Sequence, residues 1–454
     1  MRKSAALSVP EPLILVVCGV AIYQLYVPLG GSIHVTLWLA VAFLYPAVSL
    51  LAGLPLKRSL STPALAGLAI ILLSFAVAIP LSSDPTLGVI MSVWMLAALS
   101  GYFMGFHFGS RGKVDGLLRG LVLCMSPVAL VNIVFFAAGS LEEMFFSSAV
   151  ARFLIEPDTL AQLYRPRFGF NAVHPLKAGT FFVNANVASI FFGLGLCASV
   201  FLWSRQRTRR GLLLVILFFL AFLATGSRAG LLAALATMMV VLAVLGLRVS
   251  VKRMVGAFAV AALAFALILV LPYSRFAVER ILGLSQNLDP RWLIWYHAAK
   301  VVYANPLTGI GFGGWQETFP VFARTFGLDP SLPPHNAFLI AWLWGGLIGL
   351  AGMLVLFGGS LYAFLRASRH PGLRDLALLG CASVVWVAVQ LMFTNFALAE
   401  PRIGAVFFLS VGAVMGGMLW EKTQSGKARS GLQEPHSSRV RSVAVPSAAR
   451  DGSI

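Results

Sequence analysis

Long apolar runs recur along almost the whole chain, and they constrain its fold more than any other feature. A run of about 17 to 25 apolar residues is the length that an α-helix needs to cross a bilayer. About twelve such runs are present, near residues 13–28, 33–54, 63–80, 87–108, 117–138, 180–203, 211–225, 229–247, 254–272, 336–364, 376–397 and 403–420. Since backbone polar groups in lipid must be satisfied within each segment, we predict an all-α polytopic membrane protein.

Composition agrees with this interpretation. Hydrophobic residues make up 59% of the 454 residues and charged residues only 11%, whereas about a quarter of a soluble domain is charged. All four cysteines lie inside apolar runs, so neither a disulfide framework nor a thiolate metal site is indicated. A net charge of +18 would suggest nucleic-acid binding in a soluble protein. Here membrane topology accounts for most of the basic residues, and no nucleic-acid partner is expected.

The short basic connections all fall on one side of the membrane if the N-terminus, with Arg2 and Lys3, is cytoplasmic. This is the pattern of the positive-inside rule. These connections are residues 57–58, 111–113, 205–210, 248–253 and 366–374. The first apolar run is interpreted as a retained helix, because no small-residue cleavage site follows it. We predict a transmembrane domain over residues 1–420 and a disordered, basic cytoplasmic tail over residues 421–454.

Two long connections lie on the opposite face, over residues 139–178 and 273–335. In the second, Asp289-Pro290 predicts a helix start, and the next break is Asn305-Pro306. The helix between them carries several aromatic residues and little charge, which favours a position at the membrane interface. We therefore predict a helical cap on this face.

Arg228 stands alone between two apolar runs, in the sequence ATGSRAGLL. An arginine near the bilayer is costly unless it has a partner or reaches the interface. One interpretation is an arginine that extends from a helix end toward water. The other is an arginine that faces an anion held at the membrane surface, which Gly226 and Ser227 would let approach.

His335 is the second candidate, placed by Pro333 and Pro334 at the start of an apolar run. A neutral imidazole can accept a proton from a sugar hydroxyl near neutral pH. An isolated histidine can equally well be structural. Asn336 follows it directly and is either a helix cap or a substrate contact.

Further arginines and a lysine lie on the same predicted face. A guanidinium pairs bidentately with phosphate oxygens, although each such charge taken singly can be a solvated loop residue. The candidates are Arg291, Arg167, Arg165, Lys177 and Arg275; Arg402 shares their side of the membrane. Asn184 and Asn186, at the entrance to a span, are either helix caps or sugar contacts. The acidic residues show no metal-binding spacing, so no metal and no cofactor are expected.

Four motifs, in this order, resemble the O-antigen ligase superfamily, which also includes O-antigen polymerases and protein O-oligosaccharyltransferases. They are SRAG at residues 227–230, RWLIW at 291–295, NPLTGIGFGGW at 305–315 and PPHNAFL at 333–339. The resemblance covers roughly residues 181–339. No single motif is specific, but their order and their predicted placement on one face support the match.

The resemblance implies a GT-C-like glycosyltransferase with about twelve transmembrane helices and a periplasmic helical cap, in the bacterial inner membrane. The implied donor is a glycan on undecaprenyl diphosphate, and the acceptor of a ligase is a sugar hydroxyl of lipid A-core. The implied transfer is inverting and metal-independent. His335 matches the expected general base, and Arg228 and Arg291 match the arginines expected to hold the diphosphate. Trp292 and Tyr296 either stack on a sugar or anchor the cap among membrane lipids.

Three alternatives remain open at this point. A polymerase would join glycan units to each other, and a protein O-oligosaccharyltransferase would modify Ser or Thr of a protein. From a different class, the chain could transport an anionic lipid. Alternating access predicts internal repeats and mid-membrane charges, and the sequence shows no convincing repeat and few such charges.

Overall fold

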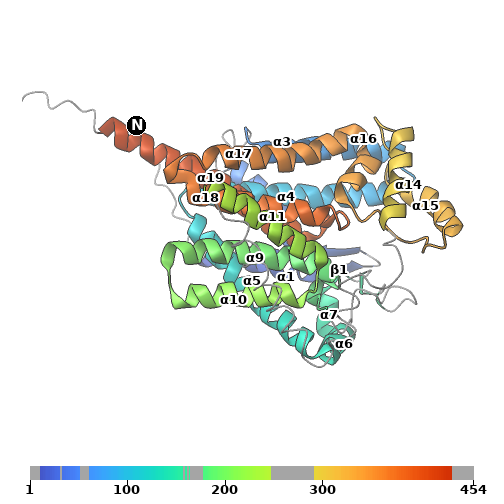
Figure 1. Ribbon diagram of the computed structural model, residues 1–454, viewed down its shortest axis with the longest axis horizontal. Helices are drawn as coiled ribbons and strands as arrows, with labels where there is room; N and C mark the ends of the chain where they lie inside the picture. Colours follow the sequence, from blue (N-terminus) through green and yellow to red (C-terminus); the bar gives the residue numbers. More distant parts are fainter. Residues whose placement is uncertain are drawn as a thin grey trace, which may run out of the picture.

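The computed structural model describes residues 11–30, 33–51, 61–156, 159–160, 163, 177–246 and 291–431. Within these ranges the chain forms a bundle of long helices with smaller helices at one end (Figure 1). Seven helical segments of the described ranges are long and apolar enough to cross a membrane. They are Pro63–Leu81, Pro85–Ser110, Val114–Ala137, Ala185–Gln206, Ala337–Ala367, Pro371–Leu391 and Pro401–Gly426. The prediction of a polytopic, largely helical membrane protein is therefore supported.

The bundle contains long and short helices. They are α1 (Glu11–Tyr23), α2 (Leu37–Leu51), α3 (Pro63–Ala78), α4 (Pro85–Ser110), α5 (Val114–Ala137), α9 (Ala185–Gln206), α10 (Arg209–Ala224), α11 (Arg228–Val244), α16 (Ala337–Leu354), α17 (Ser360–Ala367), α18 (Arg374–Leu391) and α19 (Pro401–Gly431). Each predicted span except 254–272, which lies outside the described residues, overlaps one of them. The count of twelve spans is not confirmed, because α1, α2, α10 and α11 are shorter than the seven long segments and are not among them.

Helices α4 and α19 form the centre of the bundle, and glycines let their backbones approach closely. A Cβ atom at Gly105 of α4 would lie 2.1 Å from the carbonyl oxygen of Leu409. A Cβ at Gly412 of α19 would lie 2.2 Å from the carbonyl oxygen of Tyr102. In a membrane the hydrophobic effect does not drive helices together, because lipid is as apolar as the helix surface. Small residues at helix crossings instead allow close van der Waals packing. The central pair supports the elements around it.

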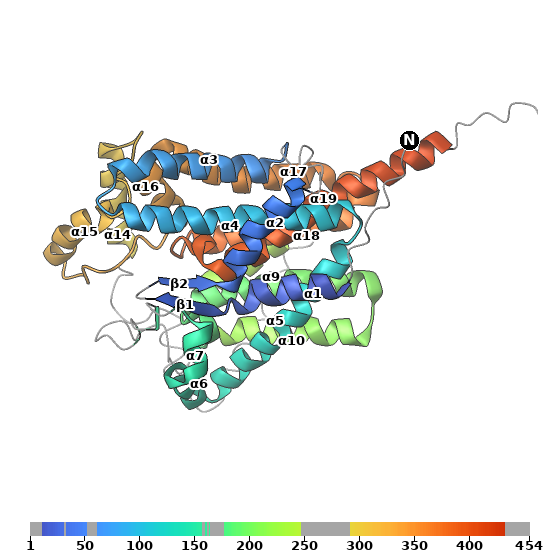
Figure 2. The same cartoon turned by 180° about the vertical axis from the view of Figure 1, so that it is seen from behind.

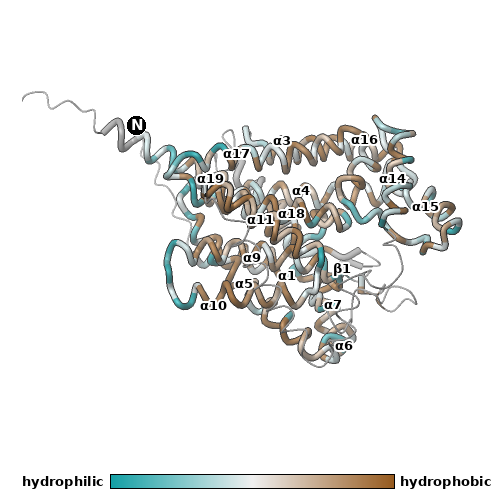
Figure 3. Tube along the Cα trace, viewed as in Figure 1, coloured by the Kyte–Doolittle hydropathy of each residue, from teal (hydrophilic) through white to brown (hydrophobic). Residues whose placement is uncertain are grey.

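The described basic connections gather at one end of the bundle. Arg205 at the end of α9 pairs with Asp115 at the start of α5, with 2.9 Å between Nη1 and Oδ1. Arg374 at the start of α18 donates to the carbonyl oxygen of Val244 at the end of α11. Figure 3 shows polar connections at the end of the bundle where α9 joins α10. The charge asymmetry of the sequence thus corresponds to an asymmetry of the molecule.

Among the residues that the structure describes, four cap helices and a hairpin lie at the opposite end (Figure 2). The cap helices are α6 (Gly139–Ser147), α7 (Ala149–Leu154), α14 (Arg291–Ala304) and α15 (Gly314–Thr325). The predicted helix ending at Asn305-Pro306 corresponds to α14. The predicted spans 13–28 and 33–54 are too long, because their facing ends instead pair as antiparallel strands β1 (Tyr26–Gly30) and β2 (Ile33–Thr36).

A glycine-rich loop over residues 305–313 fastens the cap to the bundle. Helix α16 breaks at Gly345 and Gly346, and the loop bonds to the freed backbone groups. The amide of Leu347 donates to Pro306 O, and the amide of Ile310 donates to Leu343 O at 2.7 Å. The other side of the loop bonds the α3–α4 turn, where the amide of Phe312 donates to Ser82 Oγ at 2.8 Å. The cap is therefore held by two bundle elements.

Candidate functional site

The turn between α10 and α11 presents Arg228. Ser227 is the N-cap of α11, and its Oγ accepts from the Gly230 amide at 3.1 Å. The same hydroxyl donates to Oδ1 of Asn186 at 2.9 Å, which joins the turn to the start of α9. These bonds make Arg228 the first residue of α11, where the helix dipole already favours an anion. The sequence element SRAG thus builds an anchored helix start that carries a cation.

The guanidinium of Arg228 is exposed. Within the described ranges it makes no hydrogen bond and no ion pair, so its donors can face a ligand. Lys177 lies close to the same turn, because the amide of the next residue, Ala178, donates to the carbonyl oxygen of Ala224 at 3.0 Å. Two cationic residues thus belong to one corner of the cap end.

The two asparagines at the start of α9 support this corner. Asn184 is the N-cap of α9, and its Oδ1 accepts from the amide of Asn186 at 2.9 Å. Asn186 in turn accepts the hydroxyl of Ser227. Both side-chain oxygens therefore hold the local structure in place. A contact of either amide with substrate stays a prediction.

Helix α14 carries the second predicted arginine, Arg291, as its first residue. Trp295, one turn later on the same face, donates its Nε1 proton to the carbonyl oxygen of Pro334 at 3.0 Å. The ring of Trp295 also packs on Phe393, with centroids 6.1 Å apart. Arg291 is half-buried, and its backbone position is about 6 Å from that of Trp295 along the helix axis. The first turn of α14 therefore adjoins the loop that precedes His335.

Trp292 and Tyr296 lie on another part of α14. Their exposed fractions are 70% and 46%, so they face outward from the cap. Lys300 Nζ lies 4.8 Å from the centroid of the Tyr296 ring. This placement fits a side chain that contacts membrane lipid at the interface, and a role of either ring in sugar stacking stays a prediction.

His335 is held in an uncommon backbone conformation, with a φ of +51°. Few residues other than glycine adopt the left-handed region, and those that do cluster at functional sites. The bond from Trp295 to Pro334 fixes the chain before it. After it, Asn336 is the N-cap of α16 and accepts from the amides of Phe338 and Leu339 at 3.0 and 3.2 Å. His335 is therefore positioned from both sides.

The C-terminal end of α18 links these separate pieces. Gln390 of α18 donates to Ser189 Oγ of α9 at 2.7 Å, and α11 packs along α18. Three residues further on, Phe393 contacts Trp295 of α14. The start of α11, the start of α14 and the His335 loop are thus arranged around one helix end. Arg165, Arg167 and Arg275 lie outside the described residues.

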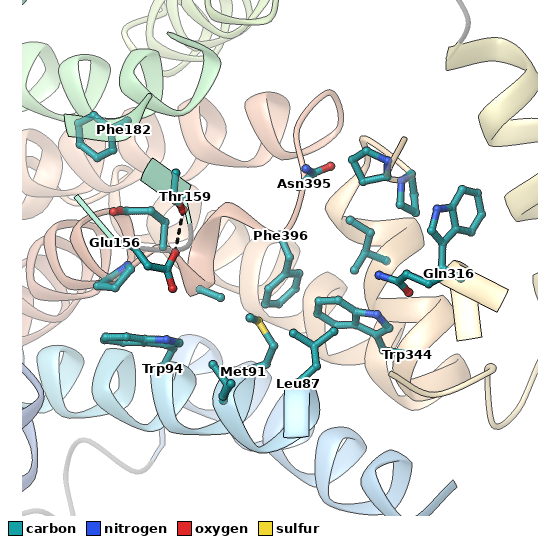
Figure 4. Close-up of a pocket in the computed structure, with 18 of the residues that line it drawn as sticks. Leu87, Met91, Trp94, Glu156, Thr159, Phe182, Gln316, Trp344, Asn395 and Phe396 are labelled. Carbon is teal, nitrogen blue, oxygen red and sulfur yellow. Dashed lines mark hydrogen bonds between the residues drawn. The ribbon is translucent and has the colours of Figure 1, made fainter. Parts of the chain in front are cut away.

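A cavity of about 430 Å³ adjoins this arrangement, since Pro333 and Pro334 form part of its wall. The rest of the wall comes from α4, the start of α15, α16 and residues 395–402, together with Tyr26 of β1 and residues 155–156, 159, 181–182 and 330–331. In Figure 4, Glu156 and Trp94 lie toward one end, and Gln316 and Trp344 toward the other. The sequence did not predict this cavity, because its walls come from segments far apart in the chain.

Arg402 lies in the cavity wall, and the sequence analysis assigned it no role. It is 2% exposed. It donates to Glu400 Oε1 at 3.0 Å, to Ile22 O at 3.1 Å and to the carbonyl oxygens of Tyr23 and Leu154. Burial raises the pKa of the Glu400 carboxyl, and the Arg402 charge opposes that rise. The signal that was available is a lone arginine in an apolar run, as for Arg228.

The described residues contain no group of three or more His, Cys, Asp or Glu side chains that could hold a metal ion. Comparison with known families finds that residues 213–354 match the family model described as O-antigen ligase. The matched range contains Arg228, Arg291 and His335. No curated protein matches the chain.

Proposed function

We propose that this chain, as a member of the O-antigen ligase family, joins a lipid-linked glycan to a sugar hydroxyl of lipid A-core. Proteins of this family are glycosyltransferase-like enzymes of O-antigen and lipopolysaccharide pathways. The proposed donor is a glycan on undecaprenyl diphosphate. The product of the reaction is complete lipopolysaccharide.

One observation supports the proposal: two motif-bearing helices contact the C-terminal end of α18. A Cβ at Gly230, two residues after Arg228, would lie 3.3 Å from Gln390 Nε2, and Trp295, four residues after Arg291, contacts Phe393 and bonds to Pro334 beside His335. Arg228, Arg291 and His335 come from three separate motifs of the matched range. We propose that their two guanidinium groups and one imidazole converge on the donor, because departure of a diphosphate requires cationic donors and a base. The cap helices beside them would shield the reaction from water.

The proposed chemistry needs few groups, because a glycosyl diphosphate is already activated. The imidazole of His335 removes the proton of the acceptor hydroxyl as its oxygen attacks the anomeric carbon. The bond from that carbon to the diphosphate breaks, and the leaving oxygen keeps the electron pair. Arg228 and Arg291 neutralise the charge that develops there. Attack opposite the leaving group inverts the anomeric configuration, and no step calls on a metal ion.

The proposed site faces the periplasm of a Gram-negative inner membrane. Its support is that the basic connections lie at the other end of the bundle, and basic loops favour the cytoplasmic side. Both substrates are anchored in lipid, so they would reach the cap from within the membrane plane. Arg165, Arg167, Lys177 and Arg275 are proposed to attract the phosphate groups of carrier and acceptor.

The test is deletion of the gene, followed by complementation and electrophoresis of extracted lipopolysaccharide. We expect core-only lipopolysaccharide in the deletion strain and restored ladders with the wild-type gene. The variants His335→Ala, Arg228→Ala and Arg291→Ala should each lower transfer by about 100-fold or more. Arg324→Ala, at an exposed arginine of α15, is the matched control and should transfer normally.

Other outcomes are informative and would contradict the proposal. Core plus one repeat unit in the deletion strain indicates a polymerase. Intact lipopolysaccharide with a missing glycan on a protein indicates a protein O-oligosaccharyltransferase. Near-normal transfer by a stably inserted His335→Ala protein removes the general-base role from that residue.

A further inference from the structure

The cavity beside the His335 loop offers a second set of groups, distinct from the arginines and the histidine. Its volume of about 430 Å³ falls within the range of roughly 300 to 1,000 Å³ that is usual for small-molecule sites. Its wall combines aromatic side chains with a few polar ones. The chemical class of its ligand can be inferred from the wall groups that have no hydrogen-bond partner among the described residues.

Two tryptophans of the wall have indole N–H groups with no acceptor among the described residues. By contrast, Trp295, Trp315, Trp342 and Trp386 each donate to a backbone carbonyl oxygen, and of these Trp315 also lines the cavity. Trp94 of α4 and Trp344 of α16 line the cavity, and neither donates to any described residue. A tryptophan N–H can only donate a hydrogen bond, and these two half-buried side chains leave it open to the cavity. The acceptor can therefore come from a ligand.

The rings of the wall are held rigidly from behind. Trp344 packs on Phe312 and Phe396, with centroids 4.8 and 5.5 Å apart. Phe75 contacts all three of these rings. An aromatic face that is fixed in advance loses little entropy when a ligand packs against it. The wall is therefore suited to a flat apolar face such as the C–H face of a sugar ring.

Polar groups complete the wall at both ends. Glu156 is exposed, and its Oε2 accepts the hydroxyl of Thr159 at 2.9 Å, which leaves its other oxygen for a ligand. The side-chain amides of Gln316 and Asn395 are also exposed, and they make no hydrogen bond within the part of the chain described here. A carboxylate accepts hydrogen bonds, and an amide both donates and accepts. Vicinal sugar hydroxyls match this combination.

The charge of the wall argues against a diphosphate. Its only described cation, Arg402, has its donors bound to Glu400 and to three backbone carbonyl oxygens. Two carboxylates, Glu156 and Glu400, face this single committed guanidinium. An anion would meet net negative charge there. A hydrocarbon chain would also be a poor occupant, because it would bury the indole N–H, amide and carboxylate groups without partners.

We propose that this cavity binds the sugar rings of the donor glycan that lie next to its diphosphate. This inference rests on the proposed function, since it assumes a glycan donor whose diphosphate is held near Arg228 and Arg291. Pro333 and Pro334 in the wall directly precede His335. Sugar in the cavity would therefore continue toward the proposed reaction centre.

The experiment compares two probes on the full-length protein in lipid nanodiscs. One is undecaprenyl diphosphate without glycan, and the other is the glycan-bearing carrier purified from cells that lack this gene. We expect Glu156→Gln and Trp94→Ala to weaken binding of the glycan-bearing carrier by about tenfold and that of the bare carrier by less than about twofold. Glu156→Gln keeps the side-chain shape, so this variant alone tests the sugar site if Trp94→Ala fails to fold.

Matched controls and a third variant separate this inference from the proposed function. Glu143→Gln on exposed α6 and Trp420→Ala at the far end of α19 should bind both probes normally. Arg228→Ala should weaken both probes, and normal binding and transfer in that variant would reject the proposed function instead.

Two results would overturn the sugar site itself. Equal weakening of both probes by Trp94→Ala and Glu156→Gln would assign the cavity to the prenyl carrier. Unchanged binding of both probes, with or without a raised KM for the lipid A-core acceptor, would exclude a donor-sugar site.

Discussion

Arg402 is a buried cation whose hydrogen bonds join α1, α7 and the start of α19. We predict that Arg402→Met lowers the free energy of unfolding by about 3 kcal/mol or more, because Glu400 loses its buried partner. Adding Glu400→Gln should recover part of the loss. Thermal unfolding in detergent measures both changes. Arg205→Met, in a pair whose side chains are 40% and 33% exposed, should cost less than about 1 kcal/mol. Equal losses at the two sites would contradict this assignment.

We expect His297 to make the cap sensitive to acid. Its imidazole stacks on Phe322 with centroids 4.5 Å apart, and its Nε2 has no hydrogen-bond partner among the described side chains and backbone groups. Burial, and secondarily the charge of Lys300, lower its pKa below the ordinary 6.5. A lowered pKa favours the neutral form of His297 in the folded state. The contribution of this residue to the free energy of unfolding is therefore complete above about pH 6.5, and it is lost as the pH falls toward the folded-state pKa.

The consequence is measurable as a melting temperature at pH 7.5 and at pH 5.5. We predict a fall on acidification for the wild type and a smaller fall for His297→Phe, which cannot be protonated. His370→Phe, at an exposed position between α17 and α18, should behave as the wild type does. An undiminished fall in His297→Phe would show that another group causes the acid sensitivity.

At the scale of elements, the break in α16 and the loop over residues 305–313 depend on each other. Gly346 has a φ of +60°, and a Cβ added there would lie 1.9 Å from the carbonyl oxygen of Leu307. We predict that Gly346→Ala destabilises the protein by about 2 kcal/mol and exposes the cap to limited proteolysis. Gly358→Ala is the control, because its Cβ would meet nothing within 4 Å. Equal protease resistance in the two variants would contradict the proposed fastening.

The elements that could be predicted from sequence are those that depend on local information. Apolar run lengths gave the long helices, and Asn305-Pro306 gave the end of α14. The capping interpretation of Asn184 and Asn336 gave the starts of α9 and α16. The hairpin of β1 and β2 was missed because apolar strands in a short run resemble the end of a span. Hydropathy cannot distinguish the two.

The candidate site was predicted less completely, and the reason is sequence separation. Arg228, Arg291 and His335 each lie in a short local motif, so each could be predicted as a site residue from the sequence alone. The partners of Arg402 lie 380 and 248 residues away, and no local pattern indicates them. The cavity is similar, because Trp94 and Trp344 look like ordinary apolar-run tryptophans until the fold brings α4 and α16 together.

At the scale of the whole molecule, the two ends of the bundle differ in charge and in structure. We predict that a cysteine at Thr325 in α15 reacts with a membrane-impermeant maleimide from the periplasm, and that one at Gln206 reacts only after lysis. Both positions are exposed, so accessibility should depend on orientation. Gel shifts of labelled protein from intact and lysed spheroplasts give the measurement. The reverse labelling order would place the proposed site in the cytoplasm.

The interruption of α16 at Gly345 and Gly346 divides this helix into two stretches. The first begins at Asn336 beside the His335 loop, and the second runs on toward α17. We expect a bulky lipid-linked substrate at the cap to be accommodated by a tilt of the first stretch relative to the second, because the helix is already interrupted between them. Such a tilt would open the bundle toward one leaflet alone, without the rocking of both halves that a carrier protein needs.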